Sequence, residues 1–296
     1  MRRGKILVVL GPTASGKSDL AVKLAEKFNG EVVSADSRQV YEGLDIGSGK
    51  ISDRNMRGIP HHMLDVLPPK KVLTVEEFRE KSLNIIDDIL ARGKVPIVCG
   101  GSGFYIQAIV DNTVFPDVPP NPKLRDKLET ISAEKLLKKL ASVDRRRAKE
   151  MDPNNKRRII RAIEIATALG KVPKTKNEPK YKVFMAGIKT PPDVLKEKIH
   201  IRLIYRMKKG MIEEAKKLRA SGLSLKRMEA LGLEYRYLAR HLSGKLNKNQ
   251  MLVELENEIW KFARRQMTWF RRDKRIKWFD IKKTAQIEKA ARKFLK

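Results

Sequence analysis

The sequence has one cysteine, Cys99, in 296 residues, and it has no apolar run long enough to span a membrane. A single cysteine excludes an internal disulfide and a cysteine-rich metal site, which is typical of proteins from a reducing compartment. The first apolar run, residues 6–10, goes straight into a polar loop and lacks the form of a signal peptide. We therefore expect a soluble, cytoplasmic protein that does not bind a membrane.

Acidic side chains are scarce relative to basic ones. The chain has 35 Asp and Glu against 65 Lys and Arg, which gives a formal net charge of +30. Residues 1–110 carry 16 basic and 13 acidic side chains, whereas residues 111–296 carry 49 and 22. A lysine-rich proteome would raise the charge of both parts alike. The uneven distribution instead predicts a polyanionic partner that is bound by the later part.

A phosphate-binding motif follows the first apolar run. Residues 11–18 read GPTASGKS and fit G-x-x-x-x-G-K-[ST], between an expected strand and an expected helix. The glycines let the backbone wind around an anion, so that N–H groups and the helix N-terminus face it. Lys17 adds a positive charge, and the Ser18 hydroxyl is placed for Mg²⁺. The motif predicts phosphate binding but does not identify the phosphate compound.

Residues 5–110 read as an α/β segment with a parallel sheet of the P-loop NTPase type. A short strand, 31–37, ends in polar residues that include Asp36. Chemistry gathers at the carboxyl ends of parallel strands, so we expect Asp36 beside the phosphate loop. Thr74 and Glu77 predict a capping box for a helix through about Ala91. A later strand, 94–99, runs into glycines instead of a magnesium-binding aspartate, which argues against simple ATP hydrolysis.

The composition changes at a proline-rich stretch, residues 115–122. Helical patterns follow at 123–132, 133–140 and 157–169, and an apolar strand pattern returns at 182–188. We therefore expect an inserted helical domain, 113–182, in a core made of 1–112 and 183–296. The rest of the core is expected to be mostly helical. It includes one long helix over 193–221 that carries Arg202 and Arg206 on one face.

Several residues that suggest chemistry have a simpler interpretation. His61 and His62 lack a Cys or carboxylate at metal-ligand spacing, so we expect structural or positioning roles. Cys99 is expected to be a small strand residue. Trp260 and Trp269 are expected to pack in a core, whereas the arginines next to them at 264–272 are better candidates for contacts with nucleic acid.

Seven segments together resemble the tRNA isopentenyltransferase family, the bacterial tRNA dimethylallyltransferases. In chain order they are GPTASGKS at 11–18, SADSRQVYEGLDIGSGK at 34–50, PHHMLD at 60–65, VCGGSGFY at 98–105, DPNNKRRIIRAIE at 152–164, IHIRLIYRM at 199–207 and RRQMTWFRR at 264–272. They follow the family's order over nearly the whole chain. The segment GGSGFY replaces the commoner GGTGLY, and LGLEYR at 231–236 departs from the usual Ile-Gly-Tyr-Arg pattern.

The resemblance implies transfer of a dimethylallyl group from dimethylallyl diphosphate to N6 of adenosine 37 in the tRNA anticodon stem-loop, with Mg²⁺, by a monomer. It implies Asp36 as the base and Arg206 as a catalytic arginine near the diphosphate. It assigns diphosphate binding to Gly11, Pro12, Thr13, Ala14, Ser15, Gly16, Lys17 and Ser18, with Ser18 also at the metal. It assigns tRNA contacts to Asp36, Ser37, Arg38, Gln39, Ser102, Arg125, Arg157, Arg158, Ile159, Ile160 and Arg161. Arg158 and Arg161 share a helical face. The alternative to tRNA binding by these two arginines is a structural role in which they pair with Asp152 or Glu164.

Three other functions remain open at this stage. A small-metabolite kinase would share the first 110 residues but has no use for the charge of the rest. An RNA-binding NTPase explains the charge but should carry an aspartate after the strand 94–99. An adenylate isopentenyltransferase acts on a free nucleotide and has no use for a basic inserted domain.

Overall fold

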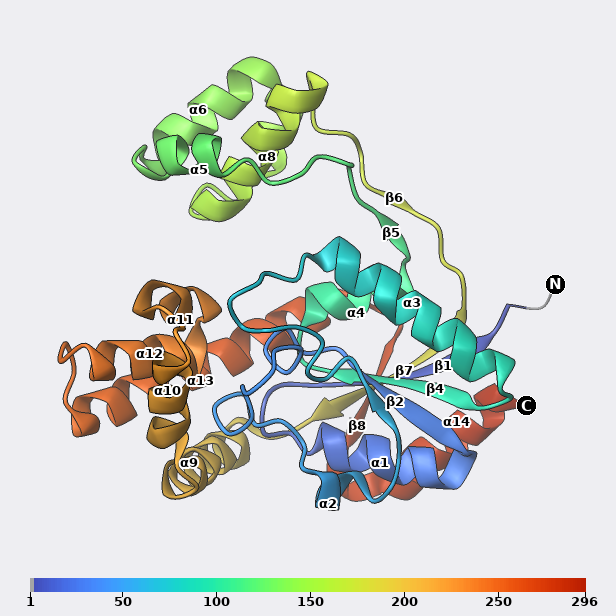
Figure 1. Ribbon diagram of the computed structural model, residues 1–296. Helices are drawn as coiled ribbons and strands as arrows, with labels where there is room; N and C mark the ends of the chain where they lie inside the picture. Colours follow the sequence, from blue (N-terminus) through green and yellow to red (C-terminus); the bar gives the residue numbers. More distant parts are fainter. Residues whose placement is uncertain (1–2) are drawn as a thin grey trace. The chain divides into compact units, whose positions relative to one another are not determined.

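The computed structural model describes residues 3–296 and divides into two compact units (Figure 1). The larger unit consists of the residues up to Asn112 together with Pro179–Lys296, and the smaller unit is Thr113–Glu178. The chain therefore leaves the larger unit once and returns to it once. No helix within residues 3–296 is both long and apolar enough to cross a membrane.

A six-stranded sheet forms the centre of the larger unit, in the order β3-β2-β4-β1-β7-β8, and every pairing is parallel. The strands are β1 (Lys5–Leu10), β2 (Gly30–Ser34), β3 (His61–His62), β4 (Val95–Gly100), β7 (Lys182–Lys189) and β8 (Ile276–Asp280). Strands β1 and β4 are largely apolar, as expected for parallel strands that are covered on both faces of the sheet. The expected α/β class with a parallel P-loop-type sheet is confirmed.

Successive side chains of β1 pack into two different cores. Ile6, Val8 and Leu10 belong to one hydrophobic cluster, and Leu7 and Val9 belong to the other. Helices α1 (Lys17–Phe28) and α14 (Thr284–Leu295) contribute to the second cluster, and α3 (Val75–Ala91), α4 (Gly103–Val110), α9 (Pro192–Lys208) and α13 (Lys248–Phe270) contribute to the first. The remaining helices of this unit are α2 (Asp53–Met56), α10 (Met211–Ala220), α11 (Leu225–Leu231), α12 (Leu233–Leu242) and the short 3-10 turn η1 (Ile281–Lys283).

The capping box predicted for α3 is present. Thr74 Oγ1 accepts the Glu77 backbone N–H at 3.2 Å, and Glu77 Oε2 accepts the Thr74 backbone N–H at 2.8 Å. The helix runs from Val75 to Ala91, as the sequence predicts.

The single helix expected over residues 193–221 is wrong. The structure has two helices there, α9 and α10, and the break falls at Gly210, whose φ is 94°. This left-handed conformation strains residues that carry a Cβ, whereas glycine adopts it readily. The break allows α10 to take a direction of its own, and Glu214 on α10 then accepts the backbone N–H groups of Asp45 and Gly47 at 3.0 Å each.

The smaller unit has its own hydrophobic core. Its helices are α5 (Pro122–Glu129), α6 (Ala133–Val143), α7 (Arg145–Glu150) and α8 (Lys156–Leu169), and a two-stranded antiparallel ribbon joins β5 (Thr113–Val114) to β6 (Lys176–Asn177). Leu136 and Leu140 of α6 pack in one cluster with Ile159 and Ile163 of α8. The sequence predicts three of these helices and misses α7 and the ribbon.

Candidate active site

The motif GPTASGKS forms the loop between β1 and α1. Gly16 has a φ of 84° and stands immediately before α1, whose first turn receives no hydrogen bond from an N-cap side chain. The first N–H groups of α1 therefore remain available to an anion. Lys17 donates from Nζ to the Pro12 carbonyl at 3.2 Å, so its amine folds back over the loop. The expected strand–loop–helix context of the motif is thus present.

Burial lowers the pKa of Lys17, and the positive charges of Arg202 and Arg206 act in the same direction, whereas Asp36 raises it. These groups lie at about the same place although they come from distant parts of the chain. A bound polyphosphate would offset this concentration of positive charge. Cys99 also lies here, and burial raises the pKa of its thiol to about 12, so the thiol stays protonated near neutral pH.

Asp36 follows β2 and is oriented by its own turn. Its Oδ1 accepts the backbone N–H groups of Arg38 at 2.8 Å and Gln39 at 3.4 Å. Oδ2 receives no hydrogen bond from residues 3–296, so it is the carboxylate oxygen that can accept a proton from a ligand. The Ser37 backbone N–H donates to Ser102 Oγ at 3.0 Å, which joins this turn to the loop after β4. Four of the residues expected to contact tRNA therefore lie together with Asp36, namely Ser37, Arg38, Gln39 and Ser102.

Two arginines of α9 face the same region but differ in their partners. Arg206 is 6% exposed and donates from NH1 to Glu234 Oε1 at 2.8 Å and to the Gly47 carbonyl at 3.0 Å. Arg202 donates to the Gly49 carbonyl at 3.0 Å, and it forms no ion pair within residues 3–296. Burial, followed by the charge of Arg206, lowers the pKa of Arg202 to about 10. Arg202 is therefore the arginine of this pair that lacks a counterion.

From the sequence, the diphosphate contact falls to Arg206, and Arg202 is named only as sharing its helical face. The signal was present, because the two arginines are four residues apart on α9 and share a helical face. The sequence could not show that Glu234, from the segment LGLEYR, already neutralises Arg206. The role of Arg206 at the diphosphate stays a prediction.

The phosphate loop and α9 line one cavity of about 1150 Å³. Its basic residues are Lys17, Lys50, Arg54, Lys198, Arg202, Arg206 and Lys209, and its acidic residues are Asp19, Asp45, Asp53 and Asp65. Lys50 is paired with Asp45 and Asp65, and Arg206 is paired with Glu234. Arg54, Lys198 and Lys209 are exposed, whereas Lys17 and Arg202 are partly buried and form no ion pair within residues 3–296, so these two cationic groups are the ones best placed to bind a phosphorylated ligand.

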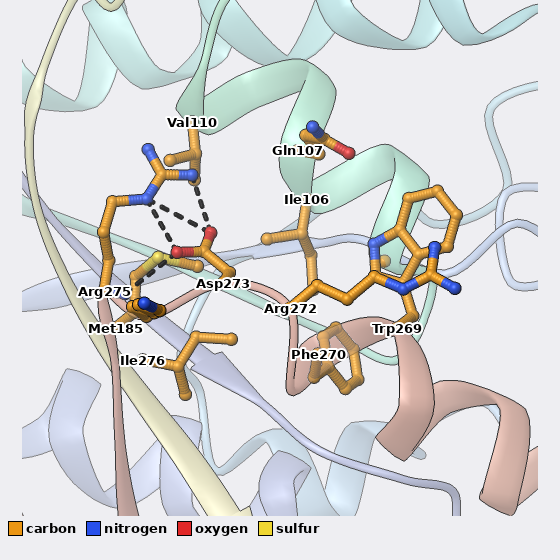
Figure 2. Close-up of a pocket in the computed structure, with 12 residues that line it drawn as sticks. Ile106, Gln107, Val110, Met185, Trp269, Phe270, Arg272, Asp273, Arg275 and Ile276 are labelled. Atoms are coloured by element: carbon orange, nitrogen blue, oxygen red, sulfur yellow. Dashed lines mark hydrogen bonds and ion pairs between the residues drawn. The ribbon is translucent and has the colours of Figure 1, made fainter. Parts of the chain in front are cut away.

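A second cavity of about 540 Å³ lies between α4, the end of α13 and the start of β8 (Figure 2). Arg275 spans part of its wall and donates to Asp273 Oδ2 at 2.6 Å (Figure 2). Arg275 also donates to Asp111 Oδ1 at 2.7 Å. Trp269 stands edge-to-face against Phe104, with ring centroids 6.4 Å apart. Trp260 and Trp269 also pack against the large hydrophobic cluster, in agreement with their interpretation as packing residues.

In the smaller unit, Arg125 and Arg161 both bind Glu164, whose carboxylate is buried. Arg125 donates from Nε to Oε1 at 2.8 Å and from NH2 to Oε2 at 2.7 Å, and Arg161 donates from NH1 to Oε2 at 2.7 Å. Burial alone would raise the pKa of Glu164, but the hydrogen bonds that it accepts hold that pKa below its ordinary value. The alternative partner considered for Arg161 is thus the one that the structure shows.

The other predicted tRNA contacts of this unit divide into two groups. Arg157 and Arg158 are exposed on α8. Ile159 and Ile160 are buried in the core of the unit, at 0% and 3% exposure, so neither side chain reaches its surface. The predicted contacts of all these residues with tRNA are not tested by the structure and stay predictions.

The two histidines that suggest a metal site have protein partners. His62 Nε2 lies 2.7 Å from Glu31 Oε2, and His61 Nδ1 lies 2.8 Å from the Ile59 carbonyl. Within residues 3–296 no three His, Cys, Asp or Glu side chains are grouped so that they could hold a metal ion. Structural roles for both histidines agree with these contacts.

The site combines a phosphate loop after β1, a carboxylate after β2, from which β1 is separated by β4, and an arginine without an acidic partner in the described part of the chain. These features define a P-loop protein that is suited to transferring a group from a phosphorylated donor. A family model described as IPP transferase matches residues 39–273. The chain belongs to this family of prenyltransferases, and the resemblance found in its motifs is confirmed.

Individual relatives support the same assignment over the full chain. A tRNA dimethylallyltransferase of Anoxybacillus flavithermus is 36% identical over 297 residues, which cover 98% of this chain and 95% of that protein. The crystal structure of the full-length tRNA isopentenylpyrophosphate transferase of Bacillus halodurans is 32% identical, with a TM-score of 0.76, and the match covers 99% of this chain and 97% of that one. A eukaryotic dimethylallyltransferase acting on tRNA is 28% identical, with a TM-score of 0.77, over 90% of this chain and 69% of that one.

Proposed function

We propose that this protein transfers the dimethylallyl group of dimethylallyl diphosphate to N6 of adenosine 37 in tRNA and releases diphosphate. The observation that carries the proposal is the convergence of the phosphate loop, Arg202 and Asp36. The first two offer positive groups to a diphosphate, and the third offers a carboxylate oxygen to an amine. Family membership supplies the class of reaction.

The donor is bound by its diphosphate. Backbone N–H groups of residues 14–18, the Lys17 amine and the Arg202 guanidinium hold the anion at one side of the cavity. As the bond between the allylic carbon and oxygen breaks, its electron pair moves to the diphosphate. The same groups stabilise that developing charge because they are already in place before the reaction.

Mg²⁺ is the cofactor that we infer for this site. Ser18 is exposed at the start of α1, and no cluster of three acidic or histidine ligands lies within residues 3–296. That donor set fits Mg²⁺, which commonly keeps several waters and binds through substrate phosphates rather than through a cage of protein ligands. When bound, the ion neutralises charge on the diphosphate.

Asp36 acts on the acceptor. The exocyclic amine of adenine is a weak nucleophile, so the carboxylate orients it and takes its proton as the new bond from N6 to carbon forms. One carboxylate oxygen is fixed by the turn, and Oδ2 is left for the amine. The adenine reaches this site only after it leaves the stack of the anticodon loop.

The tRNA is held chiefly by charge. Residues 111–296 carry 49 basic against 22 acidic side chains, and Arg157 and Arg158 are exposed on α8. Neutralisation of phosphates by such side chains releases counterions and gives affinity without base specificity. We infer that the protein works in the cytoplasm, as a monomer, on the anticodon stem-loop.

The test is an incubation with labelled dimethylallyl diphosphate, Mg²⁺ and, in separate reactions, tRNA, AMP or ATP. Label should enter tRNA alone, and mass spectrometry of the digested tRNA should find N6-dimethylallyladenosine at position 37. Label in AMP or ATP would identify a free-nucleotide prenyltransferase. Hydrolysis of ATP as fast as transfer would refute dimethylallyl diphosphate as the ligand of the phosphate loop.

A further inference from the structure

Gln266 is a buried polar residue on α13, and its amide joins two loops of the site. Its Oε1 accepts the Thr13 backbone N–H at 2.9 Å, and its Nε2 donates to the Gly101 carbonyl at 2.8 Å. Thr13 belongs to the phosphate loop after β1, and Gly101 belongs to the loop after β4. An inverted amide would place donor against donor and acceptor against acceptor, so only this orientation satisfies both backbone groups.

The loop after β4 is shaped to admit this amide. A Cβ at position 101 would overlap Nε2 of Gln266, so the glycine leaves room for this amide to approach the backbone. The next residue, Ser102, donates its backbone N–H to the Ala35 carbonyl at 3.2 Å and accepts the Ser37 N–H through Oγ at 3.0 Å. Asp36 stands between these two partners. A continuous set of hydrogen bonds therefore connects the phosphate loop, through Gln266, to the turn that holds Asp36.

We propose that Gln266 is a positioning residue that fixes the phosphate loop relative to Asp36, and so fixes the donor relative to the acceptor. The proposal rests on the function proposed above. Both polar atoms of the side chain bond to backbone groups, so it acts through the two loops and not on either substrate. A misplacement of about 1 Å between reacting atoms can slow a reaction roughly 100-fold. The loss of this amide should therefore slow the chemical step more than it weakens either ligand.

The first test compares Gln266→Met with the wild type. Methionine keeps the length and removes both hydrogen bonds. The single-turnover rate with saturating tRNA and dimethylallyl diphosphate should fall by roughly 10- to 100-fold. Titrations of tRNA and of the donor with Mg²⁺ should give nearly unchanged dissociation constants. A normal single-turnover rate would overturn the proposal, and so would a rate loss that is fully explained by weaker binding.

The second test uses Gln266→Glu and pH. An ionised carboxylate still accepts the Thr13 N–H but repels the Gly101 carbonyl, whereas a protonated carboxyl donates to that carbonyl as the amide does. Burial raises the pKa of such a carboxyl. The loops packed against it bring Lys17, which favours the ionised form, and Asp36, which favours the neutral form. Arg264 and Arg265, on its own helix, are exposed.

The rate of Gln266→Glu relative to the wild type should rise as the pH is lowered from about 9 to about 6. The ratio removes the pH dependence of the wild-type reaction. Gln286→Glu makes the same chemical change on the exposed face of α14, and its ratio should stay near one at every pH. If the ratio for Gln266→Glu stays constant over this pH range, the proposal is overturned, whatever the value of the ratio.

The controls separate this proposal from the proposed function. If the wild type does not prenylate tRNA, the proposed function fails. If the wild type is active and the Gln266 variants behave as the control does, the positioning role fails alone. Should Gln266→Met fail to fold in a melting experiment, the isosteric Gln266→Glu decides the question.

Discussion

Arg206→Ala should destabilise the protein, whereas Arg202→Ala should weaken donor binding at little cost in stability. The Arg206 and Glu234 side chains are each only 7% exposed, and their charged atoms lie 2.8 Å apart. Removal of the arginine leaves a buried carboxylate without its partner, which costs about 3–5 kcal/mol. For a protein of this size that loss lowers the melting temperature by roughly 6–20 °C.

Arg202 should contribute more to donor binding than to stability. Its partner is the Gly49 carbonyl rather than a carboxylate, and the nearby charge of Arg206 helps to lower its pKa. Its removal relieves repulsion in the unliganded protein, so the melting temperature should stay the same or rise slightly. A hydrogen bond to a charged group contributes about 1.5–3 kcal/mol. Dimethylallyl diphosphate with Mg²⁺ should therefore bind roughly 10- to 100-fold more weakly to Arg202→Ala.

Thermal denaturation without ligand and calorimetric titration with the donor measure the two effects separately. The double variant Arg206→Ala/Glu234→Ala is the control, because it removes the stranded carboxylate and should recover part of the lost stability. If Arg206→Ala melts like the wild type while Arg202→Ala loses several degrees, the assignment of structural and ligand-binding roles is reversed and the reasoning is refuted.

Four further variants test other parts of the molecule. Asp36→Asn should slow transfer by roughly 10²–10⁴ and leave tRNA affinity in filter binding unchanged; near-normal turnover excludes it as the base. The pKa of Glu31 lies below its ordinary value, chiefly because Arg92 donates a hydrogen bond to the carboxylate. The ionised carboxylate therefore stabilises the fold at any pH above the unfolded-state pKa of about 4.3. That stabilisation is lost as the pH falls through the lower folded-state pKa. Glu31→Gln should thus be less stable at pH 7 in urea unfolding and lose less stability on acidification than the wild type; parallel pH curves would contradict this. Arg157→Ala should reduce the slope of log affinity for tRNA against log salt by roughly one and leave the melting temperature unchanged. Arg161→Ala should lower the melting temperature, because the buried carboxylate of Glu164 loses a partner. Equal melting temperatures of the two variants would show that Arg161 is no more structural than Arg157.

The features that the sequence predicts correctly are those set by neighbours along the chain. The phosphate loop is specified by residues 11–18 and by the apolar strand before it. The start of α3 is specified by Thr74 and Glu77, three residues apart. The break at Gly210 is also local, but a lone glycine occurs inside helices as well as at their ends, so the pattern alone does not decide between the two. The tertiary fold decides it.

The parts of the site that the sequence does not reveal depend on partners far along the chain. Gln266 bonds to Thr13 and Gly101, which lie 253 and 165 residues away. Arg206 is neutralised by Glu234, which is 28 residues away on another helix. No periodicity or spacing rule connects such pairs, because they meet only when the sheet and its covering helices have formed. Charge and motif therefore locate the site, and the fold determines which arginine is available to a ligand.

Counts of basic residues alone do not show which side chains of the smaller unit are available to bind tRNA. Arg161 and Glu164 are three residues apart on α8, so the sequence allows their pairing, but only the fold adds Arg125 from α5. Two guanidinium groups share one buried carboxylate, so this cluster keeps a net charge of about +1 and still attracts a polyanion. Each of these arginines therefore affects both stability and affinity. The exposed Arg157 affects chiefly affinity, which is why the salt dependence of binding and the melting temperature must be measured on the same variants.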